Sequence, residues 1–114
     1  MSKIVVLAGE VHTLKIGLNT IRVLLNNPNI NVGEHLPIIL NLLLSHEKLP
    51  LGFSHSLTED ERKNLSPLIV EMLEAARHFS FAQLDNLYST AVGELGIGPV
   101  EANQMEPDEI ELAY

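Results

Sequence analysis

The five histidines of this 114-residue sequence have side chains that can ligate a metal ion or transfer a proton near neutral pH. They are His12, His35, His46, His55 and His78. No pair has the HxxxH or HExxH spacing, and no Glu-x-x-His motif of the di-iron type is present. His46 and His55, at the two ends of one irregular segment, could converge only through tertiary folding. We therefore predict no metal site, and a metal-binding pair of His46 and His55 is the least favoured alternative.

Nucleophilic catalysis has little support in the sequence. There is no cysteine, so thiolate chemistry, disulfides and cysteine-ligated zinc are excluded. No serine lies in a Gly-x-Ser-x-Gly setting. Gly93, Gly96 and Gly98 follow a predicted helix, whereas a phosphate-binding loop precedes one. We predict that the protein is not an enzyme and holds no cofactor.

The formal charge of −8 bears on the class of partner. Nucleic acids and anionic membranes require clustered Lys and Arg, and the seven basic residues here are scattered. The apolar run at residues 4–8 is too short for a signal peptide, and no run approaches the roughly 20 residues of a membrane span. These features predict a cytoplasmic protein that binds neither nucleic acid nor membrane.

The most apolar stretch of the chain is residues 35–44, in which Asn41 is the only polar side chain after His35. A helix that is apolar nearly all round is buried, and leucine favours helix over strand. We predict a central helix that is capped by Asn31, begins near Glu34 or His35 and places Leu40 in the core.

The N-terminal region has two possible structures. Its apolar residues are spaced three and four apart, which predicts one long helix packed along a seam: Ile4, Leu7, Val11, Leu14, Leu18, Ile21 and Leu25. The alternative is a β-strand over residues 3–8 that ends at Gly9, because Ile-Val-Val favours strand. Gly9, Thr13 and Gly17, four residues apart, either admit a close backbone neighbour or are merely tolerated in the helix.

Two capping boxes mark later helix starts. Thr58 with Glu61 opens a helix that we expect to continue, kinked, through Pro67. Ser80 with Gln83 opens another that runs to about Leu95.

Between the central helix and Thr58 lies an irregular segment, residues 46–57, that is long for a small bundle. Its apolar residues either plug the end of the bundle or contact a partner, and the candidate interaction residues are Leu49, Leu51 and Phe53.

The pattern predicts an all-α fold: a bundle of four or five helices over residues 1–98, followed by an acidic C-terminal extension, residues 99–114. The extension carries five acids and no base. A short helix after Pro107 would place Ile110, Ala113 and Tyr114 on one face, and these are further candidate interaction residues. Because so short a helix is unstable alone, we expect the extension to be either disordered or docked onto another surface, a neighbouring subunit or partner being favoured.

Residues 105–114, with the sequence MEPDEIELAY, resemble segments of small bacteriophage tail-assembly proteins. This resemblance covers ten of 114 residues, assigns no family, and implies an assembly role. The sequence as a whole predicts a non-enzymatic protein-interaction or assembly subunit that forms a homo-oligomer, such as a component of a bacteriophage or virion. The alternative is a helical bundle that binds a small apolar ligand beside the central helix, where Pro37 and Pro67 would open the packing.

Overall fold

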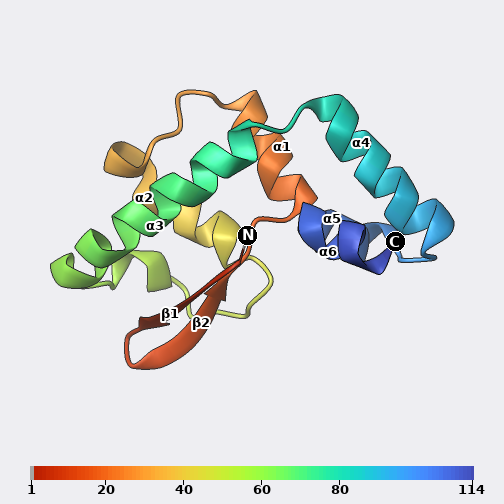
Figure 1. The fold of residues 1–114 in the computed structure, drawn as a ribbon. Coiled ribbons are helices and arrows are strands. Elements are labelled where there is room, and N and C mark those ends of the chain that lie inside the picture. The colour runs from red at the N-terminus through yellow and green to blue at the C-terminus, as the bar shows by residue number, and fades with distance from the viewer. Residues whose placement is uncertain (1) are drawn as a thin grey trace.

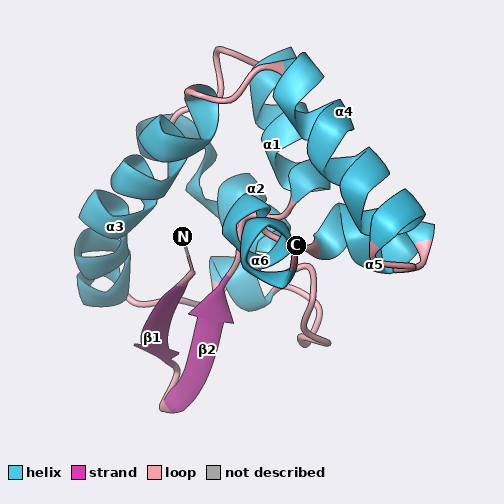
Figure 2. Cartoon of the chain, turned by 45° about the vertical axis from the view of Figure 1, so that its right-hand side comes forward, coloured by secondary structure: helices cyan, strands magenta, loops and turns pink. Residues whose placement is uncertain are grey.

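The computed structural model describes residues 2–114, and these form a mostly helical fold with one β-hairpin (Figures 1 and 2). In chain order the elements are β1 (Lys3–Leu7), β2 (Glu10–Leu14), α1 (Leu18–Asn26), α2 (Val32–Leu43), the 3₁₀ turn η1 (Phe53–His55), α3 (Glu59–Arg77), α4 (Phe81–Ser89), the π-helical turn η2 (Thr90–Glu94), α5 (Pro99–Gln104) and α6 (Pro107–Ala113). The all-α prediction is therefore correct for most of the chain and wrong at its N-terminus.

The predicted helix over residues 4–25 is replaced, in its first half, by the antiparallel hairpin β1–β2. The two residues of its turn, Ala8 and Gly9, have φ values of 50° and 78°, the positive angles that a type I′ hairpin turn requires. β-Branched side chains also favour the extended backbone on both strands. The alternative prediction, a strand that ends at Gly9, is confirmed.

The hairpin buries one face and exposes the other, as strand alternation demands. Val5, Leu7, His12 and Leu14 point into the protein, whereas Ile4, Val6 and Val11 point away from it. The predicted three-four series thus combined residues from both faces of the hairpin with residues of α1. Of its members on α1, Leu18 and Ile21 are buried and Leu25 is half-buried, while the neighbouring Leu24 is buried in its place.

Gly17, just before α1, is where another backbone approaches closely. A Cβ atom at this position would lie 2.7 Å from the carbonyl oxygen of Gln104, at the end of α5. The close approach predicted for this glycine is confirmed, while Gly9 meets no such neighbour and serves the turn instead.

Helix α2 is the predicted central helix. The Asn31 side chain accepts a hydrogen bond from the Glu34 N–H at 3.0 Å, as expected of a cap. Leu40 and its neighbours Ile39 and Leu43 are fully buried. The helix begins slightly earlier than predicted, at Val32, and helical backbone angles are interrupted at His35.

Both capping boxes are present. Thr58 and Glu61 exchange the two expected hydrogen bonds at the start of α3, and Ser80 and Gln83 do so at the start of α4. Helix α3 continues through Pro67 as one element, as predicted. The predicted second helix is shorter, because α4 gives way to the turn η2 before the chain reverses at Gly96, with φ 68°.

The acidic C-terminal residues fold onto the rest of the chain (Figure 2). Ala102 of α5 and Ile110 of α6 are fully buried and belong to the same hydrophobic cluster as α1–α4. The expectation that this segment is disordered or docked on a partner is wrong, because its apolar residues complete the protein's own core.

Helix α3 lies alongside β1. The Ala8 N–H at the end of β1 donates to Glu61 Oε2 at 2.8 Å, and Lys3 at its start pairs with Glu71 at 3.7 Å. The part of α3 between Glu61 and Glu71 and the five residues of β1 each span about 15–17 Å, so this part of the helix matches the strand in length. Over residues 2–114 no helix combines the length and the apolarity that crossing a membrane requires.

Candidate functional site

The first group of predicted interaction residues lies around η1. Leu51 is completely exposed, whereas Leu49 and Phe53 are half-buried against the core. Together with the end of α2 they line an open hollow of about 530 Å³. Leu51 therefore does not close the end of the bundle, because its side chain lies on the surface.

The second predicted group lies on α6 and is divided by the fold. Ile110 is fully buried, while Ala113 and Tyr114 are exposed. The prediction that these three share one interaction face is wrong for Ile110, because that side chain fills the protein's own core. No residue of α6 lines the hollow beside η1.

Sequence reasoning missed a third apolar surface, on the outside of the hairpin. Its members, which we call the outer hairpin face, are Ile4, Val6 and Val11, with exposed fractions of 76%, 65% and 69%. Alternating β-branched residues already indicated a strand here, but the three-four spacing of the apolar residues made a helix the favoured prediction. Three large aliphatic side chains exposed together on a two-stranded sheet are a typical contact surface.

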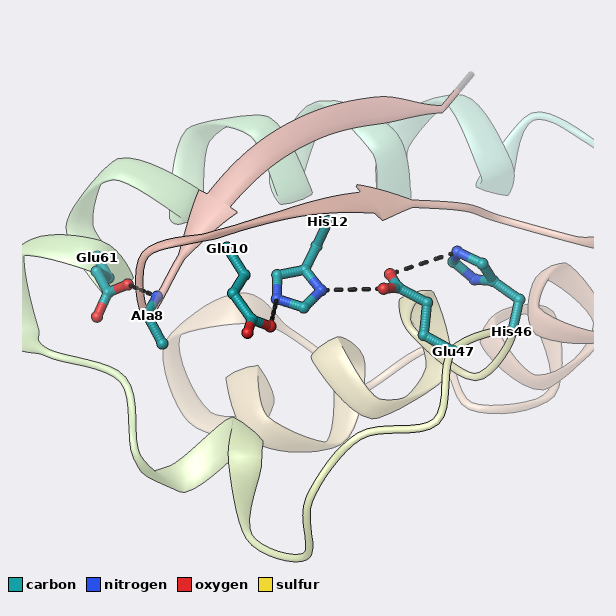
Figure 3. Close-up of polar contacts among 6 residues, drawn as sticks. All are labelled: Ala8, Glu10, His12, His46, Glu47 and Glu61. Atoms are coloured by element: carbon teal, nitrogen blue, oxygen red, sulfur yellow. Dashed lines mark hydrogen bonds and ion pairs between the residues drawn. The ribbon is translucent and has the colours of Figure 1, made fainter.

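The inner face of the hairpin carries a polar cluster instead (Figure 3). His12 Nδ1 lies 3.0 Å from Glu47 Oε1, a hydrogen bond in which the imidazole donates to the carboxylate. The other oxygen of Glu47 lies 3.6 Å from His46 Nε2, and His12 Nε2 lies 4.0 Å from Glu10. The Phe53 ring packs against the imidazole of His12 at a centroid distance of 5.2 Å.

This cluster attaches β2 to the segment that follows α2. His12 is only 4% exposed, so its ring is held between Glu47 and Phe53 and is removed from solvent. His46 takes part, but His55 is exposed on η1 and contributes no ligand to the cluster. Within residues 2–114 no three His, Asp or Glu side chains converge as metal ligands would.

Glu61 connects the hairpin turn to α3 (Figure 3). One carboxylate oxygen accepts from the Thr58 N–H at 3.0 Å and the other from the Ala8 N–H at 2.8 Å. Hydrogen bonds from the Thr58 backbone, and then from Ala8, stabilise the ionised form and lower the pKa of Glu61 below its ordinary value. The carboxylate thus joins the hairpin turn to α3 without burying a charge.

Glu106 makes the corresponding connection at the other end of the hairpin. Its carboxylate accepts from the Ile16 N–H at 3.0 Å, and its own backbone N–H donates to Glu109 Oε1 at 3.1 Å at the start of α6. The side chain is almost completely removed from water, and this burial raises the pKa of Glu106 even though the Ile16 hydrogen bond opposes the shift.

The buried polar groups around the hairpin therefore hold it in place, and its outer face is the part left without a partner. Comparison of this chain with protein-family models, with curated proteins and with solved structures finds no match.

Proposed function

We propose that this protein is a non-enzymatic interaction or assembly subunit that associates with itself through the hairpin. The single observation that carries the proposal is the outer hairpin face, where Ile4, Val6 and Val11 are exposed on a rigidly held sheet. At about 25 cal/mol per Å² of apolar surface, covering such a face favours association.

Two further features support the proposal. The hairpin is fixed at its turn by Glu61, at its middle by Glu47 and at its far end by Glu106, so little ordering entropy opposes binding. The resemblance of residues 105–114 to segments of small bacteriophage tail-assembly proteins also favours an assembly role.

The test is the mass of the protein in solution as a function of concentration, for the wild type and for Val11→Asp. A charge placed on the outer hairpin face has to be desolvated if that face is covered, so Val11→Asp should shift the equilibrium at least tenfold toward monomer.

The matched control is Val100→Asp. Val100 is exposed to a similar degree, 74%, on α5, and the substitution changes the net charge by the same amount. A wild type that stays monomeric at millimolar concentration, or equal dissociation by the two variants, would contradict the proposal.

The hollow beside η1 supports a second candidate function, the binding of a small apolar ligand next to the end of α2. Its apolar lining comes from Leu44, Leu49, Leu51 and Phe53. An environment-sensitive apolar dye would reveal such a site if its fluorescence rises with the wild type and Phe53→Ser abolishes the increase. Phe81→Ser, at an exposed aromatic residue outside the hollow, should leave the increase unchanged.

A further inference from the structure

A pocket of about 220 Å³ lies at the start of α1, next to α5 (Figure 1). Its polar lining includes Lys15, Thr20 and His46. None of the described Asp and Glu residues lines it, although the chain has fifteen acids and only seven Lys and Arg. By contrast, the hollow beside η1 is lined by Glu47 and the one beside Arg22 by Asp85. At this pocket an acidic protein presents hydrogen-bond donors without carboxylates.

The first turn of α1 leaves backbone donors without acceptors. The Leu18 N–H donates to the Met105 carbonyl at 2.9 Å, but the N–H groups of Asn19 and Thr20 make no hydrogen bond within residues 2–114. The cap residue, Gly17, has no side chain that could accept one. N–H groups of a first helical turn point past the start of the helix, where the helix dipole adds partial positive charge. Because Asn19 and Thr20 line the pocket, an acceptor inside it would satisfy them.

The Thr20 side chain is a second, independent indication of a ligand. Thr20 is only 8% exposed and lines the pocket, yet its hydroxyl has no hydrogen-bond partner in the part of the chain that the structure describes. A polar group removed from water without a partner is unfavourable, so buried hydroxyls are nearly always paired. The Cα–Cβ bond of a helical residue tilts toward the N-terminus, which directs this hydroxyl to the same end of α1 as the free N–H groups.

Lys15 adds a positive charge to these donors. Its ammonium lies 3.0 Å from Glu109, a contact that uses one of its three N–H groups and leaves two for a ligand. His46, which pairs with Glu47 at 3.6 Å, also lines the pocket, while both glutamates lie outside the lining. Salt screens charges beyond roughly 8 Å, so the distant part of the −8 charge has little effect on a small ion here.

We propose that this pocket binds the phosphate group of a small phosphate monoester, to which the Asn19 and Thr20 N–H groups, the Thr20 hydroxyl and Lys15 donate. A phosphate offers three terminal acceptor oxygens, which suits this number of donors better than the two of a carboxylate. Val23 and Leu42 give the pocket an apolar wall for the carbon part of the ester. The site uses no residue of the outer hairpin face and is independent of the proposed self-association.

Titration followed by amide NMR tests the site, because two of the proposed donors are observed directly. The probes are glycerol 3-phosphate, inorganic phosphate and acetate. We expect glycerol 3-phosphate to shift the Asn19 and Thr20 N–H resonances saturably at millimolar concentration. Inorganic phosphate should bind more weakly, because it makes no contact with the apolar wall, and acetate more weakly still.

Thr20→Val isolates the hydroxyl, because valine keeps nearly the same shape. The variant should bind glycerol 3-phosphate about tenfold more weakly, the usual effect of losing one hydrogen bond to a charged group. It should not unfold more easily than wild type, since the hydroxyl has no partner within the described chain. The matched control is Thr90→Val, at a half-buried position of η2 outside the pocket, and it should leave binding unchanged.

Lys15→Gln tests the charge. Its matched control is Lys63→Gln, because Lys63 also pairs with a glutamate, Glu59, but lies outside the pocket. We expect Lys15→Gln to weaken binding of glycerol 3-phosphate about tenfold or more and Lys63→Gln to leave it unchanged.

Three results would overturn the inference. The first is the absence of a saturable shift at Asn19 and Thr20 with either phosphate probe, and the second is equal binding by the site variants and their controls. The third is acetate or inorganic phosphate binding as tightly as glycerol 3-phosphate, which would indicate a carboxylate site or an adventitious ion only. The mass of the protein in solution still decides the proposed self-association separately.

Discussion

Glu106 and Glu61 illustrate how two chemically identical side chains come to affect stability in opposite directions. Both accept backbone N–H groups from the ends of the hairpin region. Glu106 is buried, so removal from water dominates and raises its pKa, whereas Glu61 is only partly buried, and the hydrogen bonds from Thr58 and Ala8 lower its pKa. Local solvent access, rather than the number of hydrogen bonds, decides the sign.

Replacing Glu106 with Gln should change the pH dependence of unfolding. Because the folded pKa is raised, the folded state binds the proton more tightly, and the contribution of Glu106 is fully present below about pH 4.5 and is lost as pH rises through the folded pKa. Denaturant unfolding from pH 4 to pH 8 should therefore show the stability of Glu106→Gln rising relative to wild type over that window.

The control is Glu111→Gln, which removes the same charge from an exposed position of α6. If the Glu106→Gln and Glu111→Gln curves run parallel, the burial argument for Glu106 is wrong.

At the scale of elements, the cap of α3 also anchors the hairpin. Thr58 and Glu61 form a local box, but the second oxygen of Glu61 reaches the turn at Ala8, fifty-three residues earlier. Helix α3 and β1 thus share one carboxylate, and loss of its charge affects both elements.

Glu61→Gln tests this shared contact. With its folded pKa lowered, Glu61 contributes stability that is present above about pH 4.5 and lost as pH falls through the folded pKa. The variant should be less stable than wild type at pH 7, and the difference should shrink on acidification. Glu59→Gln, in the same first turn but outside the capping box, serves as the control. A constant difference at every pH would contradict the assignment.

These elements show where prediction from sequence works. The capping boxes at Thr58 and Ser80 depend on residues three apart, and both were found. The hairpin was missed as the first choice because its turn is Ala-Gly, and Ala gives no signal for a positive φ, unlike the Asn-Gly or Asp-Gly pairs that mark such turns. Its apolar residues also happened to follow a helical spacing.

At the scale of the whole molecule, the C-terminal helices complete the core instead of extending from it. Their acidity suggested solvation, and the residues that contradict this, Ala102, Glu106 and Ile110, are buried by partners in distant parts of the chain. A contact such as that of Glu106 with Ile16, ninety residues apart, leaves no local pattern to read. The outer hairpin face was missed for a different reason, because the three-four spacing of its apolar residues favoured a helix over the strand alternation that was also present.

Ile110→Ala should destabilise the protein by about 2–5 kcal/mol, the usual range for a large aliphatic side chain deleted from a core. Leu112, two residues along and 88% exposed, provides the control, and Leu112→Ala should change stability by less than about 0.5 kcal/mol. Chemical denaturation measures both. Equal effects would mean that α6 does not pack as described.

The junction of residues 16–18 with residues 104–106 has a kinetic consequence. The Leu18 N–H donates to the Met105 carbonyl at 2.9 Å, Ile16 donates to Glu106, and the Gln104 carbonyl lies against Gly17. Closing so long a loop carries a large entropic penalty that is recovered only when all these contacts form together. Helices α2 and α3, whose contacts are nearer in sequence, can form first. We expect the joining of residues 16–18 to residues 104–106 to be the slow step of folding. Substitutions at this junction should slow refolding in proportion to how completely its contacts are formed in the transition state.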